Sequence, residues 1–486
     1  MPCGDRAADA YRLPIRRIAM SKLSRRQVQE PAAQAEVHPF AGLTRLQPHA
    51  AGADIGAHEI VVCVPGLADT QLVRTFGTYT ADLESLAVWL KTHAVETIAM
   101  ESTGVYWIPL FELLEQRGFR CCLINAAATK RMPGRKSDVA DAQWIQTLHS
   151  YGLLANAFRP EAELIALRTL LRHRAQLVQH RSPHILHMQK ALLQMNLQLS
   201  QVLSDVTGET GLKIIRAIVA GERDPHVLAA LRNSRCHKDA AEIALALTGT
   251  WRAEHLFVLQ QSLELFDFYT AQITACDAEV ERTYTAIRPE WGGDQPELPP
   301  LDHKPRSHSK NHPQDVQVRE HLYRIVGVDL VAVPGISASN AQTIVAEVGS
   351  SLERFPSAKH FCSWLSLAPH NDISGGKVLR SYRLKNHNRA GQAFIQAAAA
   401  LIRSDTVFGA CYRRLKSRIG PAQALIATAH KLARMVYKML KDKVPYEHTT
   451  AQEEDERFRE REIAYLRRRA AKLGLTLNES QESLVS

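Results

Sequence analysis

The chain has 486 residues, of which 45% are hydrophobic and 23% charged, and its formal net charge is +10. This length allows two or three domains with separate cores, and the composition is ordinary for a soluble protein. No apolar run reaches the roughly 18 residues of a membrane span, and the N-terminus lacks the apolar core of a signal peptide, which excludes these classes. The eight cysteines form no C-x-x-C pair, so we expect a reducing cytoplasm and no structural zinc.

Two stretches are predicted to lie outside any core. Residues 1–50 are rich in Arg and interrupted by Pro, which indicates a basic disordered arm, with an Arg-rich targeting peptide as the alternative. Met20 is an alternative start. At the other end, residues 447–486 are predicted to form a charged helical tail whose exposed face carries both signs.

An α/β domain is predicted over residues 51–157. Strands are expected around Asp54 and at 60–64, 72–76, 97–100 and 120–124, and helices at 82–93, 106–116 and 139–153. The order β-β-β-α-β-α-β-α favours a mixed sheet whose first three strands form antiparallel hairpins.

Four acids of this domain are candidates for a metal site. Asp54 lies on the first strand, Glu101 follows the fourth strand, and Asp138 and Asp141 are spaced to share one face at the start of a helix. Singly, each suits a turn, and Asp138 suits a helix N-cap. Together they favour a shared cation, because grouped carboxylates are costly to bury without one. Oxygen ligands suit Mg²⁺ or Mn²⁺, and the chemistry indicated is phosphodiester cleavage or transfer.

Residues 158–287 are predicted to be a helical spacer. Leucines recur every three or four residues from Leu164 to Leu203, which fits a long antiparallel hairpin, a coiled coil or the apolar stripe of a core helix. Pro183 is expected to break or kink this helix. Residues 288–321 are rich in Pro and His and are expected to be a flexible linker.

Residues 322–446 are predicted to be a small, mostly α-helical domain. Pro334-Gly335-Ile336 resembles the turn of a helix-hairpin-helix motif, which holds phosphate with backbone amides, although a plain packing turn is the alternative. Ser374 precedes Gly375-Gly376, where backbone can approach a ligand closely, and it is a candidate nucleophile or an ordinary loop serine. Cations follow it at Lys377, Arg380, Arg383, Lys385 and Arg389.

Positive charge is concentrated in this last domain. Residues 374–443 hold fifteen Lys or Arg and two acids, a net charge of +13. This segment therefore carries more than the net charge of the whole chain. Such a concentration is typical of a surface that binds nucleic-acid phosphates, and it predicts a steep salt dependence of binding.

The motifs in this order resemble the DEDD transposases of bacterial insertion sequences, which join a RuvC-like N-terminal domain to a serine-bearing C-terminal domain. The resemblance extends from about Gly52 to Tyr446, apart from the Pro-rich linker. Its motifs are Asp54-Ile55-Gly56, Glu101-Ser102-Thr103-Gly104, Lys136-x-Asp138-x-x-Asp141-Ala142, Pro334-Gly335-Ile336 and Ile373-Ser374-Gly375-Gly376. The basic arm and the long linker depart from the expected pattern.

The resemblance implies an RNase H-like domain, a coiled-coil spacer and a small helical transposase domain. It also implies that Asp54, Glu101, Asp138 and Asp141 bind Mg²⁺ and that Ser374 attacks DNA to form a phosphoserine. A guide RNA encoded by the element, and a tetramer or dimer in which the acids of one subunit meet the serine of another, are implied in the same way. The expected setting is the bacterial cytoplasm, at the nucleoid, with the element ends and the target as DNA partners.

Three other functions stay open. A RuvC-like junction resolvase would use metal-bound water and no serine. A DEDD exonuclease is disfavoured because that class has a second acid two residues after the first, where this chain has Gly56. A nucleic-acid-binding protein derived from a transposase would bind without cleavage, although all five chemical positions are present.

Overall fold

The computed structural model describes residues 40, 43–66, 70–102, 104–125, 137–288, 297–301, 311–313, 316–383, 388–447 and 451–476. The chain divides into two compact units, residues 1–157 and 158–486. Most of the expected arm and parts of the expected linker lie outside the described residues. Within the described ranges, no helix combines the length and apolar character needed to cross a bilayer.

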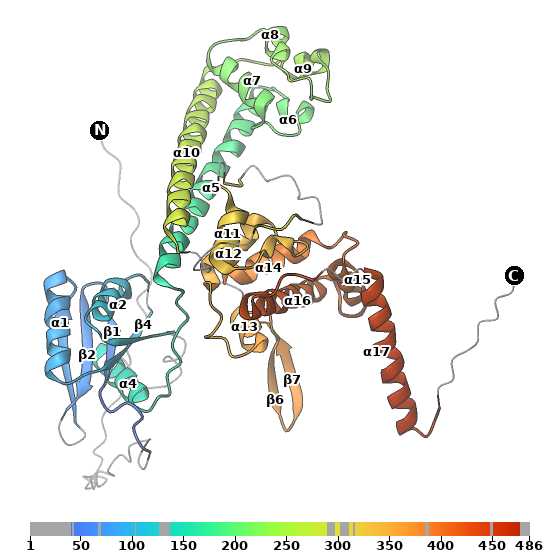
Figure 1. The fold of residues 1–486 in the computed structure, drawn as a ribbon. Coiled ribbons are helices and arrows are strands. Elements are labelled where there is room, and N and C mark those ends of the chain that lie inside the picture. Colours follow the sequence, from blue (N-terminus) through green and yellow to red (C-terminus); the bar gives the residue numbers. More distant parts are fainter. Residues whose placement is uncertain are drawn as a thin grey trace, which may run out of the picture. The chain divides into compact units, whose positions relative to one another are not determined.

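The first unit contains a five-stranded mixed sheet with the strand order β3-β2-β1-β4-β5 (Figure 1). Its strands are β1 Ala50–Ile55, β2 Glu59–Pro65, β3 Gln71–Gly77, β4 Thr97–Glu101 and β5 Arg120–Ile124. The β1, β2 and β3 strands pair antiparallel, whereas β1, β4 and β5 pair parallel. This arrangement is typical of the RNase H-like fold, and it confirms the predicted α/β domain with its antiparallel first three strands.

Helices cover both faces of this sheet. The helices are α1 Thr80–Thr92, α2 Trp107–Gln116 and α4 Asp138–Ser150. Leu86 of α1 and Leu114 of α2 are buried in one cluster with Ile98 and Met100 of the sheet. On the opposite face, Ile145 of α4 packs against residues of β4 and β5. Because side chains alternate along a strand, neighbouring residues of one strand lie on opposite faces of the sheet.

The second unit begins with two long helices that pack side by side, as Figure 1 shows. Their bounds are α5 Ala162–Gln194 and α10 Ala253–Ala286. They run antiparallel, and the intervening residues form a cap with its own core, built on α6 Leu199–Val202, α7 Glu209–Val219, α8 Pro225–Ala230 and α9 Ala240–Ala246. Of the two expectations for Pro183, a break is wrong, since α5 continues through it, and a kink stays a prediction. Packing along α10 compensates for the one missing backbone hydrogen bond.

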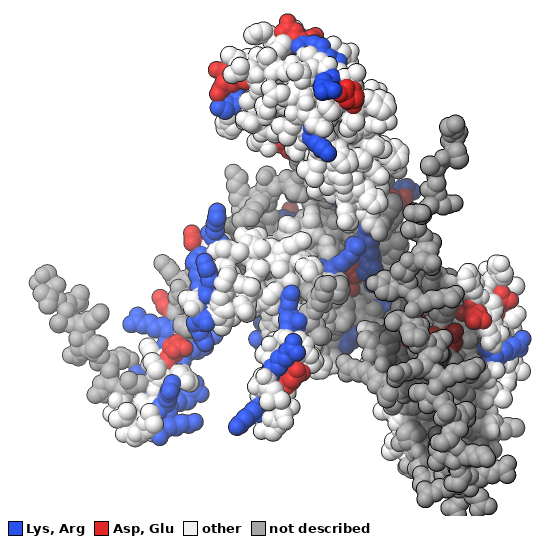
Figure 2. Space-filling view, turned by 180° about the vertical axis from the view of Figure 1, so that it is seen from behind, with Lys and Arg blue, Asp and Glu red and all other residues white. Residues whose placement is uncertain are grey.

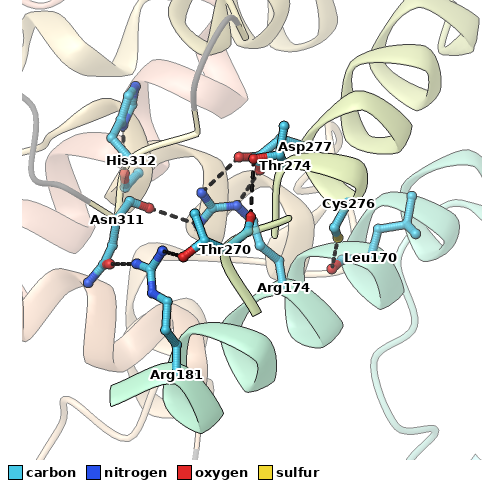
Figure 3. Close-up of polar contacts among 10 residues, drawn as sticks. Leu170, Arg174, Arg181, Thr270, Thr274, Cys276, Asp277, Asn311 and His312 are labelled. Atoms are coloured by element: carbon cyan, nitrogen blue, oxygen red, sulfur yellow. Dashed lines mark hydrogen bonds and ion pairs between the residues drawn. The ribbon is translucent and has the colours of Figure 1, made fainter. Parts of the chain in front are cut away.

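A polar network fastens the two long helices to a short piece of the expected linker (Figure 3). The guanidinium of Arg174 pairs with the buried carboxylate of Asp277 and donates 2.8 Å to the carbonyl of Asn311. Arg181 donates 3.2 Å to Thr270 Oγ1 and 2.8 Å to Asn311 Oδ1. The described residues 311–313 are thus held against α5 and α10.

The remaining helices, together with residues of α5 and α10, form the largest core among the described residues. They are α11 Val318–Val326, the short η2 Leu330–Ala332, α12 Ala338–Val348, α13 Ala358–Trp364, α14 Arg389–Ala400, α15 Val407–Ile419 and α16 Pro421–Asp442, followed by α17 Ala451–Lys472. A two-stranded hairpin, β6 His370–Ser374 and β7 Lys377–Tyr382, projects from these helices (Figure 1). The largely helical second unit confirms the predicted fold class.

Candidate active site

Strand register places two of the four predicted acids side by side. β1 and β4 are parallel neighbours with Ala53 opposite Met100, so Asp54 and Glu101 each occupy the next position. Ala53 and Met100 both point into the core under α1 and α2. The alternation of side chains therefore directs Asp54 and Glu101 to the other face, which α4 covers.

Helix α4 adds the other two acids at its first turn. Asp138 lies one turn before the buried Ala142, and Asp141 lies one turn before the buried Ile145. Both acids therefore continue the stripe of α4 that packs on the sheet. Asp138 is not the N-cap, because Ser137 takes that position and its hydroxyl accepts 3.3 Å from the amide of Ala140. The Asp138 carboxylate is thus not needed for capping.

Gly52 allows α4 to approach the sheet this closely. It lies two residues before Asp54 and on the same face of β1. A Cβ atom on Gly52 would lie 2.2 Å from the amide nitrogen of Gln146 and 2.6 Å from the carbonyl oxygen of Ala142. Glycine is therefore required because the backbones of β1 and α4 are in contact, which sequence reasoning did not identify.

Polar ties fix the position of α4 on the sheet. Gln146 donates 3.0 Å to the carbonyl of Ala50 in β1 and accepts 2.7 Å from the amide of Gln71 in β3. At the far end of α4, His149 Nε2 lies 2.9 Å from Thr97 Oγ1, whose hydroxyl donates to the carbonyl of Arg120. Because Thr97 donates elsewhere, it accepts from a neutral His149 that carries its proton on Nε2. No local sequence signal identifies these partners, which are 52 to 96 residues apart.

His149 makes the stability of the first unit depend on pH. Burial, followed by the positive charge of Arg120, lowers the pKa of His149 to about 4. The unfolded chain therefore takes up this proton near pH 6.5 and the folded chain does not, so stability falls as the pH drops from 6.5 to 4. At pH 5 the expected loss is about 2 kcal/mol.

The test compares the wild type with His149→Gln by urea unfolding at pH 7.5 and pH 5. Glutamine can still donate to Thr97 but does not titrate, so the variant should lose less stability at pH 5. Subtracting one protein from the other cancels the contributions of the remaining groups. Equal losses in both proteins would contradict the assignment.

The four acids influence one another electrostatically. The pKa of Asp54 is raised to about 6, first by burial and then by the negative charges of Asp138, Glu101 and Asp141. A hydrogen bond from the backbone of Ile55 opposes this rise. The four carboxylates therefore converge closely enough for each of the other three to disfavour the charge on Asp54.

This donor set fits a divalent cation by its chemistry. Four carboxylates supply hard oxygen ligands, and their mutual repulsion is what a cation would relieve. Within the described residues, no group of acids, histidines or cysteines is already gathered tightly enough to hold a metal ion. Asp54, Glu101, Asp138 and Asp141 are the residues whose chemistry suits such an ion.

Removal of the Asp54 charge is expected to stabilise the metal-free protein. The raised pKa means that ionised Asp54 opposes folding at pH 7.5, and this penalty disappears below pH 3.8. Solvent reaches part of this carboxylate and screens the repulsion, so Asp54→Asn should gain on the order of 1 kcal/mol. The measurement is urea unfolding in EDTA and in Mg²⁺, where Mg²⁺ should stabilise the wild type more than the variant. Destabilisation of Asp54→Asn in EDTA would contradict this.

Ser374 lies at the end of an exposed strand, next to the hairpin turn. Gly375 and Gly376 form this turn with φ of +54° and +76°, a conformation that matches the twist of a two-residue hairpin. Ser374 and Lys377 flank the turn as a register pair, so their side chains are cross-strand neighbours. The serine predicted as a loop residue or nucleophile thus stands at an accessible tip beside a cation.

The other predicted nucleic-acid contacts have different surroundings. Arg380 stacks its guanidinium 4.8 Å from the ring of Tyr382 and, like Arg383, is exposed, while Arg389 begins α14. Lys385 lies outside the described residues. Gly335 has a φ of +86°, and a Cβ there would lie 2.7 Å from the carbonyl oxygen of Ala397 in α14, so packing alone already requires glycine. A phosphate role for the Gly335 turn stays a prediction.

Positive charge is visible on the hairpin and on the α15 and α17 side of the second unit (Figure 2). Arg413, Arg414, Lys416 and Arg418 all belong to α15. On the cap of the long helices, by contrast, blue and red side chains lie next to one another (Figure 2). On the face that Figure 2 shows, the basic surface therefore belongs to the hairpin and to the α15 and α17 side, and not to the cap of the long helices.

Comparison with known proteins gives matches in both units. Residues 51–197 match the family model of DEDD transposases of the IS110 type, and residues 329–413 match the model described as "Transposase IS116/IS110/IS902 family". The "Insertion element IS110 uncharacterized 43.6 kDa protein" of Streptomyces coelicolor (strain ATCC BAA-471 / A3(2) / M145) is 28% identical over 120 residues. That match spans 24% of this chain and 29% of the relative. The two family matches contain all four acids and Ser374, respectively.

Proposed function

We propose, because the chain belongs to the IS110 family of insertion-sequence transposases, that it cuts and rejoins DNA to move its own element. One observation carries this proposal: the four carboxylates converge on one face of an RNase H-like sheet. The same chain also presents a serine at an exposed, positively charged tip. Phosphoryl transfer on DNA is the reaction that uses both features.

The four acids would bind Mg²⁺, with Mn²⁺ suited to the same oxygen ligands. A divalent cation held by Asp54, Glu101, Asp138 and Asp141 would polarise a scissile phosphate and offset the charge that develops on its oxygens. The chain's own contribution is to fix these acids in place. The strands β1 and β4 position two of them, and the ties of Gln146 and His149 hold the helix that carries the others.

Ser374 would act as the nucleophile. Its Oγ would form a bond to phosphorus while the bond from phosphorus to one sugar oxygen breaks, and that oxygen would leave as a hydroxyl end. A later attack by a DNA hydroxyl on the phosphoserine would reverse the chemistry and release Ser374. Lys377, as its cross-strand neighbour, would stabilise negative charge on the phosphate.

The basic residues near Ser374 would hold the DNA in position. Lys377, Arg380, Arg383, Lys385 and Arg389 follow the serine closely in the chain, and contacts of this kind go mainly to phosphates. Two exposed apolar side chains lie on the same hairpin, Ile373 and Leu379. They suit a hairpin that packs against a partner in a larger complex. The Gly335 turn would add backbone contacts to phosphate.

The proposal includes a guide RNA and a homo-oligomer. Following the resemblance of the motifs, an element-encoded RNA would pair with the donor and target DNA. A tetramer or dimer would bring the acids of one subunit to the serine of another. Both parts rest on that resemblance, and the bacterial cytoplasm at the nucleoid is the setting they require.

The experiment uses the purified protein with its co-purifying RNA, Mg²⁺ and end-labelled DNA that spans the ends of the element. A protein–DNA adduct that survives a denaturing gel, and that EDTA prevents, is the expected result. Metal-dependent nicks without an adduct would instead favour a resolvase that uses water. Binding without any cleavage would favour a non-catalytic protein derived from a transposase.

A further inference from the structure

A second basic site is a cavity of about 350 Å³ among the helices of the second unit. Its walls come from the segment before α5, from α5, α12 and α13, and from the start of α14. The lining side chains are Phe158, Arg168, Arg172, Glu347, Trp364, Asn388 and Arg389. We call this cavity the arginine–tryptophan pocket. Its volume is at the lower end of the range of small-ligand sites, which suits one nucleotide and not a duplex.

The pocket holds more positive charge than its acid can balance. Arg172 donates to both carboxylate oxygens of Glu347, from Nε at 2.9 Å and from Nη2 at 2.6 Å. Arg168 lies 4.0 Å from the same carboxylate, and only 19% of its side chain is exposed. Burial, followed by the neighbouring Arg172, lowers the pKa of Arg168. A partly buried cation is costly when another arginine already engages its carboxylate partner more closely, and an anion in the cavity would lower that cost.

Arg389 adds a third cation where local rules oppose one. It is the first residue of α14, the positive end of the helix dipole, and the first turn of α14 contains no acid. Among the described residues it forms no ion pair. Asn388 caps the helix through the amide of Gly391, so Arg389 is not needed for capping. A cation at this end is favourable when an anion binds between it and the helix amides.

Aromatic side chains form another wall of the pocket. The rings of Phe158 and Trp364 are 5.1 Å apart, and both contact Phe355. Asn388 donates 3.3 Å to the carbonyl of Trp364, which joins this wall to the start of α14. Trp364 and Phe158 are partly exposed. Arginines beside a fixed, accessible tryptophan form the combination that binds the phosphate and the base of an unpaired nucleotide.

We propose that the arginine–tryptophan pocket binds one unpaired nucleotide of a single-stranded nucleic acid. Arg168 and Arg389 hold its phosphate, and Trp364 stacks on its base. Arg172 and Glu347 keep the arginines in place. The pocket selects unpaired over paired nucleotides, because a base within a duplex cannot reach the tryptophan.

The test measures binding of fluorescein-labelled oligo(A) and oligo(dA) to the full chain in EDTA, and of the same strands annealed to their complements. No cleavage occurs without metal, so the result does not depend on the proposed reaction. Trp364→Leu should weaken single-strand binding about tenfold and leave duplex binding unchanged. Trp364→Phe should retain most of the affinity because it keeps a stacking ring.

The arginine variant separates the phosphate contact from the stacking contact. Arg389→Ala should weaken single-strand binding and lower the slope of log affinity against log salt by about 0.7. Trp364→Leu should leave that slope unchanged. Arg235→Ala, an exposed arginine on the cap, is the matched control and should bind as the wild type does. Stronger binding of oligo(A) would identify the strand as RNA, and stronger binding of oligo(dA) would identify it as DNA.

Two outcomes would overturn the proposal. One is wild-type single-strand binding by both Trp364→Leu and Arg389→Ala. The other is an equal loss of single-strand and duplex binding in Trp364→Leu, which would make the pocket an ordinary basic surface. If Trp364→Leu fails to fold, ultraviolet crosslinking of oligo(U) to the wild type decides instead, since the crosslinked peptide must contain Trp364.

Discussion

Ser374→Ala is expected to abolish both strand transfer and the covalent protein–DNA adduct. The alanine variant keeps every contact of the hairpin but lacks the one oxygen that can bond to phosphorus. Loss of a nucleophile of this kind lowers the rate by a factor on the order of a thousand or more. Ser374 is exposed, so the free energy of unfolding should change by less than about 0.5 kcal/mol. Denaturing gels and thermal unfolding measure the two effects separately.

Ser381→Ala is the matched control. Ser381 belongs to β7 of the same hairpin and is also exposed, but it pairs with Asn371, away from the turn. This variant should form the adduct at the wild-type rate. Nucleic-acid binding should be unchanged in both variants, because the cations remain. Recombination by Ser374→Ala at the wild-type rate would end the serine mechanism.

The arrangement of the first unit could be predicted because its signals are local. Short β-branched runs and amphipathic helices fix the order of elements, and parallel pairing brings the ends of β1 and β4 together. The positions of Asp54 and Glu101 follow from that order. The N-cap role, which was the alternative to metal binding for Asp138, is wrong because Ser137, one residue earlier, takes that position. Two adjacent capping residues leave this choice to tertiary contacts.

The second unit was harder to predict because its contacts are distant in the chain. The periodicity of α5 indicated a partner helix but could not identify α10, whose pair Asp277 lies 103 residues from Arg174. The helix does not break at Pro183, and its packing on α10 involves residues that are distant in the chain. The arginine–tryptophan pocket gathers side chains from five segments, and no sequence spacing reveals it. The Gly375-Gly376 turn, by contrast, is a local hairpin signal that the sequence contained.

Gly52→Ala is expected to damage both the stability and the activity of the first unit. The added methyl would overlap backbone atoms of α4, at 2.2 Å from Gln146 N and 2.6 Å from Ala142 O. Backbone cannot rotate away as a flexible side chain can, so α4 must move off the sheet. Overpacking of this kind costs about 3 kcal/mol. A displacement of about 1 Å at Asp138 and Asp141 would lower the cleavage rate roughly a hundredfold.

Gly118→Ala distinguishes this clash from the general cost of replacing glycine. Gly118 has a φ of +88°, but a Cβ there meets no atom within 4 Å. Its replacement should cost about 1 kcal/mol through backbone strain and leave cleavage unchanged. Cleavage is measured at a temperature where circular dichroism shows both variants to be folded. A folded Gly52→Ala with reduced cleavage would mean that the spacing between β1 and α4 sets the geometry of the four acids. Wild-type cleavage and stability in Gly52→Ala would mean that the position of α4 on the sheet does not control the site.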